Sequence, residues 1–371
     1  MPTTPINMPQ SQATQTASTT SLLRSPRLIV AVLIMLALAA LPIFALAFSQ
    51  PFLITLFSRI MIYGVAAMSL NLLIGYVGLV SFGHALYLML GAYAVAILQF
   101  YGVNSGWLQL LVAVASAALV ATLTGLICLR TSGIAFIMIT LAFAQMFFFL
   151  GISLKEFGGD DGMRLEARSI FTPIDLNATA ALYYVIFALV LFTLIITWRL
   201  INSRYGYVLR SIKSNERRTK ALGFKTDRYK LGAFVIAACI CAVAGVLLAN
   251  LSKYTSPSYG AWNISGELIV IVVLGGIGTV IGPLVGAIAL LLFEEFLTSS
   301  SNPWIAQHWQ LILGASIVLI VLVAKRGIYG LLPADPVTHN AISREPLPKD
   351  ATSKVTTSKD ASAQGGARKL S

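Results

Sequence analysis

Charged residues are scarce in this chain of 371 amino acids, where Asp, Glu, Lys and Arg make up only 11% and hydrophobic residues make up 57%. A soluble globular domain carries about 25% charged residues. This scarcity excludes a soluble enzyme and a nucleic-acid-binding domain, and it predicts an integral membrane protein. The net charge of +12 suits the same class, because the cytoplasmic loops of membrane proteins are rich in Lys and Arg.

Cysteine is scarce as well. The three that are present, Cys128, Cys239 and Cys241, all lie within apolar runs. They are too few to build a disulfide framework or a zinc site. We expect them to be small packing residues, and we expect no metal site in the chain.

Apolar runs that could cross a bilayer recur along the sequence, since a spanning helix needs about 20 apolar residues. Uninterrupted candidates lie at 28–48, 54–74, 79–99, 107–129, 133–152, 181–198, 231–250 and 311–324. The segment 265–297 would form a helix of about 50 Å and holds Gly282-Pro283 near its centre, so two shorter segments fit better than one broken span. The prediction is an all-α integral membrane protein with about ten transmembrane helices, within a range of eight to ten.

Basic residues give the orientation of these spans. With ten spans and a cytoplasmic amino terminus, most Lys and Arg residues lie on the inner side, whereas nine spans would export the basic carboxyl-terminal tail. Both termini are therefore predicted to be cytoplasmic. We expect a disordered tail at 1–27, a polytopic membrane domain at 28–326 and a largely disordered tail at 327–371, with a periplasmic loop at 153–180 and a cytoplasmic loop at 199–230.

The cytoplasmic loop at 199–230 is the most informative polar segment, because it holds ten basic residues against two acidic ones. Within it, residues 208–223 are typical of a short amphipathic helix ended by glycine. Contact with lipid headgroups, or the positive charge that cytoplasmic loops commonly carry, would explain a basic loop. A helix that ends within the loop suggests instead a docking site for a partner protein. The candidate docking residues are Leu209, Ile212, Glu216, Ala221 and Gly223.

Glycines interrupt the apolar runs in both halves of the chain, at Gly75–Gly78 and at Gly275–Gly278. Non-helical backbone is tolerated at membrane depth only where it is buried in protein or lines a wet cavity, and paired interruptions point to a substrate path in many transporters. Close helix packing through small residues explains the glycines as well, and both can hold together.

Polar residues inside the spans would be costly against lipid, so they narrow the candidate path further. The tentative pathway residues are Asn71, Gly75, Tyr76, Gly78, Ser81, Phe82, Gly83, His84, Thr140, Gln145, Gly275, Gly276 and Gly278. For His84, an uncharged hydrogen-bonded side chain is expected rather than a proton carrier.

Two absences bear on function. No Asp or Glu lies near the centre of a predicted span, which argues against a proton- or sodium-driven pump, because such pumps generally need a buried carboxylate. The P-loop pattern Gly-x-x-x-x-Gly-Lys-[Ser/Thr] is missing, so the chain is not expected to be an ATPase itself. An intramembrane enzyme would need a nucleophile and a base clustered within the membrane, and His84 is the only candidate of this kind inside a predicted span.

Several motifs taken together resemble the branched-chain amino acid permeases of ABC importers, of the LivM-like type. The longest runs from Asn71 to Ala85 and is followed by Gly91-Ala92-Tyr93. Further similar stretches lie at 139–145, 227–231, 265–267, 274–283 and 326–331. The resemblance covers roughly residues 54–332.

The resemblance implies a membrane-spanning permease subunit, in the bacterial cytoplasmic (inner) membrane, that moves branched-chain or related hydrophobic amino acids inward by alternating access. It implies a second, LivH-like permease subunit, two ABC ATPase subunits and a periplasmic or lipid-anchored substrate-binding protein as partners, besides membrane lipid and without nucleic acid. The chain would be a transport subunit and not an enzyme. It would bind no cofactor, because the partner ATPases use the ATP and Mg.

The resemblance also implies that Glu216, Ala221 and Gly223 belong to the coupling segment that docks on the ATPase. Permeases for urea, short-chain amides or other small carboxylates share much of the same pattern, so the substrate stays open. A secondary transporter coupled to an ion gradient is the alternative outside this family.

Overall fold

The computed structural model describes residues 26–48, 50–171, 178–300, 302–323 and 327–331. The chain divides into one unit at 30–332 and a second made of 1–29 and 333–371, and of the second only 26–29 are described. The tails predicted at 1–27 and 327–371 therefore lie almost wholly outside the described residues.

Helices make up nearly all of the described chain, as expected for an all-α protein. The longer ones are α1 (Pro26–Ala47), α2 (Pro51–Asn71), α3 (Ala85–Phe100), α4 (Gly106–Cys128), α5 (Ile134–Ser153), α6 (Thr179–Ile201), α7 (Arg204–Ser214), α9 (Thr226–Ser252), α10 (Trp262–Gly275), α11 (Gly282–Thr298) and α13 (Trp309–Val323). The shorter ones are the π-helix η2 (Leu72–Val77), α8 (Glu216–Ala221), α12 (Pro303–Gln307) and the 3₁₀ turns η3 (Lys155–Phe157), η4 (Gly159–Asp161), η5 (Pro257–Gly260) and η6 (Tyr329–Leu331). Two short strands, β1 (Met163–Arg164) and β2 (Tyr254–Thr255), pair antiparallel.

Five stretches of helix are long and apolar enough to cross a membrane within the described residues: Pro51–Val77, Gly106–Cys128, Ile134–Ser153, Thr179–Ile201 and Thr226–Ser252. Shorter apolar helices lie at Ile29–Ala45, Ala85–Phe100, Trp262–Gly275 and Trp309–Val323. The all-α, multi-pass membrane class is confirmed. The number of crossings and the side on which each terminus lies stay predictions.

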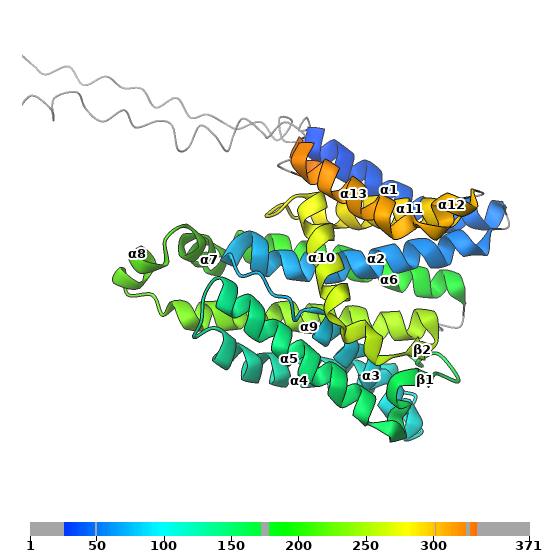
Figure 1. The fold of residues 1–371 in the computed structure, drawn as a ribbon, viewed down its shortest axis with the longest axis horizontal. Helices are drawn as coiled ribbons and strands as arrows, with labels where there is room; N and C mark the ends of the chain where they lie inside the picture. Colours follow the sequence, from blue (N-terminus) through cyan, green and yellow to red (C-terminus); the bar gives the residue numbers. More distant parts are fainter. Residues whose placement is uncertain (1–25, 49, 172–177, 301, 324–326, 332–371) are drawn as a thin grey trace, which may run out of the picture. The chain divides into compact units, whose positions relative to one another are not determined.

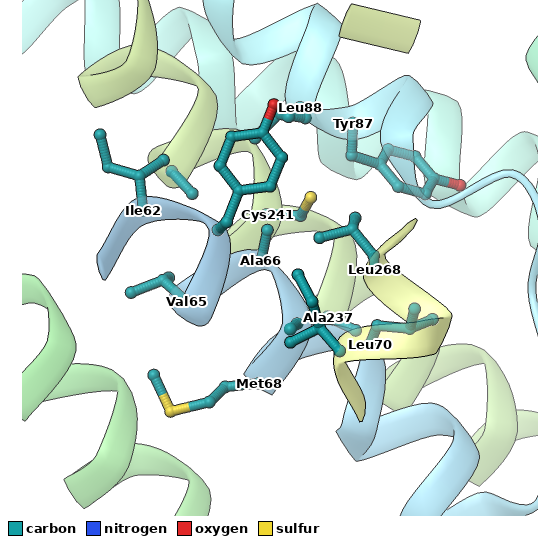
Figure 2. Packing of buried hydrophobic residues seen from close by; sticks show 14 of the residues in the cluster. Ile62, Val65, Ala66, Met68, Leu70, Tyr87, Leu88, Ala237, Cys241 and Leu268 are labelled. Atoms are coloured by element: carbon teal, nitrogen blue, oxygen red, sulfur yellow. The ribbon is translucent and has the colours of Figure 1, made fainter. Parts of the chain in front are cut away.

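Helices α2 and α9 form the centre of the unit. Helix α2 contacts α6, α9, α10 and α11, and α9 also contacts α3 and α4 (Figure 1). Every residue of α2 from Ile60 to Asn71 is buried, which is typical of a helix that is apolar all round. Figure 2 shows side chains of α2 packed among Tyr87 of α3, Cys241 of α9 and Leu268 of α10.

Small residues let α3 and α9 approach closely. A Cβ atom on Gly91 would collide with the carbonyl oxygen of Ala242, and one on Gly245 would collide with that of Leu88. Close backbone approach through glycine is a common way to pack helices where the hydrophobic effect between them is weak. These two glycines therefore serve packing.

The outer helices expose large apolar side chains, as expected where a surface faces lipid or a partner subunit. Exposed residues of this kind include Leu111, Leu119 and Leu123 on α4, Met138 and Phe149 on α5, and Phe192 and Ile195 on α6. The central helices are buried by the protein itself, and the outer ones are not.

The segment 265–297 forms two helices, α10 and α11, joined by residues 276–281. The two helices meet directly before Gly282-Pro283, near the predicted place, and these two residues are the first of α11. Pro283 is the second residue of α11, and the first four N–H groups of a helix have no partner within it, so a proline here breaks no backbone hydrogen bond. The third apolar run differs from its prediction, since its helix begins at Ala85 and not at Leu79.

Candidate functional site

The end of α2 changes from an α-helix to a π-helix over Leu72–Val77, and all six residues are buried. Short π-helical stretches are rare and frequently occur at functional sites. The stretch ends at Gly78, whose φ of 83° is strained for any residue with a side chain. The interruption predicted at Gly75–Gly78 is therefore present.

Asn71 connects this stretch to the turn between α10 and α11. Its Nδ2 donates to the carbonyl oxygen of Thr279 at 2.7 Å, and its Oδ1 accepts from the backbone N–H of Gly278 at 2.9 Å. The side chain is 1% exposed. The buried amide of Asn71 thus pairs with one backbone N–H group and one backbone carbonyl group that have no partner within a helix.

Two neighbours of Asn71 complete the same contact. The Tyr76 hydroxyl donates to the carbonyl oxygen of Gly278 at 2.6 Å, and a Cβ on Gly75 would lie 2.8 Å from both N and Cα of Gly278. We call Asn71, Gly75, Tyr76, Gly278 and Thr279 the glycine junction. It brings together the two interruptions that the sequence predicted separately.

Gly275 and Gly276 lie at the edge of the glycine junction. A Cβ on Gly275 would collide with the carbonyl oxygen of Gly282, and Gly276 begins the turn with a φ of 119°. Gly327 packs on Gly276, and the backbone N–H of Ile328 donates to the carbonyl oxygen of Leu274 at 2.8 Å. The chain that follows α13 therefore closes over the same turn.

Lys213 reaches the glycine junction from α7. Its Nζ donates to the carbonyl oxygen of Gly75 at 2.6 Å, and burial lowers the pKa of its amine below the ordinary value. Sequence reasoning missed this residue, because nothing in the sequence distinguishes it from the other basic residues of the loop. The only available signal was its place one turn after Leu209.

Four residues that were predicted to line the pathway form a second group: Ser81, Phe82, Gly83 and Thr140. The backbone N–H of Phe82 donates to Oγ1 of Thr140 at 3.3 Å, and that of Gly83 donates to Oγ of Ser81 at 3.3 Å. A Cβ on Gly83 would collide with the carbonyl oxygen of Thr140. Ser81, Gly83 and Thr140 share the lining of a small internal cavity with Tyr87.

His84 is fully buried next to this group. Its Nε2 lies 2.8 Å from Oγ of Ser69, which itself donates to the carbonyl oxygen of Ala66 at 2.7 Å. The other ring nitrogen of His84, Nδ1, has no partner among the described residues. Gln145 lines a groove with Phe82 and Trp262, and its Nε2 is buried without a hydrogen-bond partner among the described residues.

The loop at 199–230 that was predicted to be cytoplasmic contains two helices, so the single helix predicted over 208–223 is wrong. Helix α7 ends at Ser214, Asn215 is extended, and its Oδ1 accepts from the backbone N–H of Arg218 at 3.0 Å to cap α8. Asparagine is a favoured amino-terminal cap. Glu216 therefore begins a new helix and does not continue the face of Leu209 and Ile212.

The candidate docking residues divide into buried and exposed ones. Leu209 and Ile212 are only 1% and 4% exposed, so they anchor α7 to the helices beneath it. Ala221 and Gly223 are exposed at the end of α8. Gly223 has a φ of 88°, and no atom lies within 4 Å of a Cβ built there.

Glu216 ties α8 to the start of α9. Its carboxylate lies 2.6 Å from Nζ of Lys230 and 3.1 Å from Nζ of Lys220. Partial burial raises the pKa of Glu216, but the hydrogen bonds from Lys230 and Lys220 outweigh it and hold the pKa below the ordinary value of 4.5. A depressed carboxyl pKa stabilises the fold above that value, so this contact is kept at neutral pH and lost as the pH falls through the folded pKa.

Charged side chains within the helices gather where α2, α10 and α11 meet. Arg59 lies 5.7 Å from the ring of Tyr63 and interacts electrostatically with Glu267 and Glu294. The Oε1 atom of Glu267 is buried without a hydrogen-bond partner among the described residues. Among the described residues, this buried carboxylate is a candidate group for an ion-coupled mechanism.

The chain matches a known family and several of its relatives. Residues 52–322 match the model of the branched-chain amino acid transport system / permease component family. The chain is 27% identical over 312 residues to the high-affinity branched-chain amino acid transport system permease protein LivM of Escherichia coli, which covers 76% of this chain and 72% of LivM. It is 26% identical to LivH of Escherichia coli and 25% identical to BraD of Pseudomonas aeruginosa, in each case over 72% of this chain and 91% of the relative.

No solved structure matches the chain. The family match covers well over half of the chain and includes both halves of the glycine junction. The chain belongs to the branched-chain amino acid transport system / permease component family.

Proposed function

We propose that this chain is the membrane-spanning permease subunit of an ABC importer that moves branched-chain or related hydrophobic amino acids inward. The names of its relatives, which are permease proteins of branched-chain amino acid transport systems, support this substrate class. The partners would be a second, LivH-like permease, two ABC ATPases that use the ATP and Mg, and a periplasmic or lipid-anchored binding protein. The chain itself would bind no cofactor and would lie in the bacterial cytoplasmic membrane with both termini inside.

The observation that carries this proposal is the hydrogen bond from Lys213 to the carbonyl oxygen of Gly75 at 2.6 Å. It joins the polar segment α7–α8 directly to the π-helix, and Asn71 and Tyr76 join the π-helix to the turn after α10. A force applied to α7–α8 would therefore be transmitted to both interruptions at once.

The mechanism would be alternating access. Binding of ATP would close the partner ATPases, the coupling segment would move with them, and the helices would reorient around the path at the glycine junction. In this structure the side chains of Asn71 and Tyr76 are hydrogen-bonded to the backbone of Gly278 and Thr279. Opening it would break these hydrogen bonds, which contribute about 1 kcal/mol each, so energy from a partner would suffice.

The test of the docking role is the substitution Gly223→Asp. No atom lies near a Cβ at this position, so the change should leave membrane insertion intact while it alters the exposed end of α8. We expect ATP-driven uptake of leucine by the assembled transporter to fall by about tenfold, since a loss of about 1.4 kcal/mol of docking energy has that effect.

The matched control is Gly102→Asp. Gly102 has a similar φ of 79° and the same open surroundings, but it follows α3 at the opposite end from α8. Uptake should stay near wild type in this control. Wild-type uptake by the Gly223→Asp transporter would remove the end of α8 from the mechanism.

The choice between amino acids and urea, short-chain amides or other small carboxylates rests on the binding protein. Uptake by the assembled transporter should be competed by leucine, isoleucine or valine and not by urea. Competition in the opposite order would keep the importer role and change the substrate.

A further inference from the structure

A cavity of about 980 Å³ lies where the turn between α4 and α5 meets α8 and the start of α9. One wall is apolar and is made by Gly125, Leu126, Leu129 and Leu231. Leu126 is 52% exposed, so this wall continues the bare apolar face of α4. The rest of the lining, which we call the polar wall, comes from the turn after α4, from α8 with the residues just before it, and from the start of α9.

The polar wall carries an excess of positive charge. Its basic residues are Arg130, Arg217, Lys220, Arg228 and Lys230, and its acidic residues are Glu216 and Asp227. The two lysines are already engaged, since both pair with Glu216 and Lys220 also lies 3.9 Å from Asp227. The three arginines have no ion-pair partner among the described residues.

This combination of walls fits a ligand with an anionic head and apolar tails. Arginine presents planar donors that match phosphate oxygens, and basic pockets between membrane helices bind anionic lipid headgroups. Next to Leu126 on α4, Leu123 and Ile127 are 56% and 52% exposed and extend the exposed apolar surface along the helix. A soluble anion or an acidic protein surface would leave the apolar wall unused.

We propose that this cavity binds an anionic phospholipid of the bilayer, with the phosphate headgroup against Arg130 and Arg228 and the acyl chains along α4. Arg130 belongs to the turn after α4 and Arg228 to the first turn of α9, so one headgroup would bridge two elements that are far apart in sequence. The bound lipid would also lie beside Glu216 and would hold α8 in place. This inference uses the membrane location of the chain and does not depend on its role as an importer.

The test uses the full-length chain, purified without its partners and incubated with phosphatidylglycerol or phosphatidylcholine of the same acyl chains. Native mass spectrometry then reports how much of each lipid stays bound. Wild type should retain phosphatidylglycerol in preference. The double variant Arg130→Gln/Arg228→Gln should bind it about 25-fold less tightly, because each basic residue near an anionic lipid contributes about fivefold.

The matched control is Arg199→Gln/Arg204→Gln, which removes the same charge from exposed positions of the same loop that do not line the cavity. Its phosphatidylglycerol binding should stay within twofold of wild type. Equal retention of both lipids by wild type, or unchanged binding by the Arg130→Gln/Arg228→Gln variant, would overturn the proposal.

Two further measurements separate this ligand from other anions. Millimolar inorganic phosphate should not displace phosphatidylglycerol, because it cannot use the apolar wall, and displacement would contradict the assignment to a lipid. If the double variant kept its lipid but lost the ATPase subunit in a pull-down, the cavity would belong to an acidic protein surface and the proposal would be wrong.

Discussion

Uptake by the assembled transporter is expected to fall at least tenfold when Asn71 is replaced by leucine. Leucine has a similar volume but can make neither hydrogen bond of the amide, so Gly278 N–H and the carbonyl oxygen of Thr279 lose the side-chain partner that they have here. Each buried polar group without a partner costs about 1–3 kcal/mol. The chain should therefore lose about 2–6 kcal/mol of stability for the two groups, and the glycine junction should open without ATP.

Two measurements check the Asn71→Leu prediction. Thermal unfolding of the purified chain should begin at a lower temperature, and cysteine-accessibility labelling at the turn 276–281 should rise. The control is Asn263→Leu, because Asn263 lies exposed on the first turn of α10. Uptake and labelling equal to wild type in the Asn71→Leu transporter would show that the junction is not part of the transport cycle.

Replacement of Lys213 by methionine is expected to separate ATP hydrolysis from uptake. Methionine keeps the length and the apolar stem of lysine but cannot donate to the carbonyl oxygen of Gly75, which lies 2.6 Å from Nζ in this structure. A hydrogen bond with one charged partner contributes about 1.5–3 kcal/mol. Loss of this connection should lower uptake by about tenfold or more, while hydrolysis by the partner ATPases stays within twofold.

The ratio of leucine molecules transported to ATP hydrolysed is the measurement that distinguishes coupling from stability. Lys213→Arg should recover part of the ratio, because it restores a charged donor. Lys225→Met is the matched control, since Lys225 is an exposed residue of the same loop just before α9. A Lys213→Met transporter with an unchanged ratio would mean that α7 does not drive the glycine junction.

Much of the fold followed from composition and apolar periodicity. The long apolar runs became helices, since a bilayer demands internally bonded backbone and the sequence meets that demand almost everywhere. The structure departs from these predictions where a single polar residue determines the local backbone conformation. At Asn215 the side chain caps a new helix, a competition between side chain and backbone that apolar periodicity does not register.

The candidate site could be predicted only in part. The residue types at Asn71 and Gly75–Gly78 predicted an interruption of the α-helix, and the structure has a π-helix there. The partner of Asn71, however, lies 207 positions away at Gly278, and no local pattern fixes such a pairing. Lys213 was missed for the same reason, because its role depends on a carbonyl group that a regular α-helix would have used internally.

Pathway residues of the second group show a further limit of sequence reasoning. Ser81, Gly83 and Thr140 lie together, but Gln145 lines a groove with Phe82. A polar residue in an apolar run signals a need for a partner, yet it does not say whether that partner belongs to the same chain.

The measurement that tests the central claim most directly compares proteoliposomes containing this chain alone with proteoliposomes containing the complete transporter. The claim is that the chain moves solute only when a partner drives α7–α8. Leucine should accumulate against its gradient only in the complete transporter supplied with ATP and binding protein. Uphill accumulation by the chain alone on a sodium or proton gradient, abolished by Glu267→Gln, would contradict the account and place the driving force at the buried carboxylate of α10.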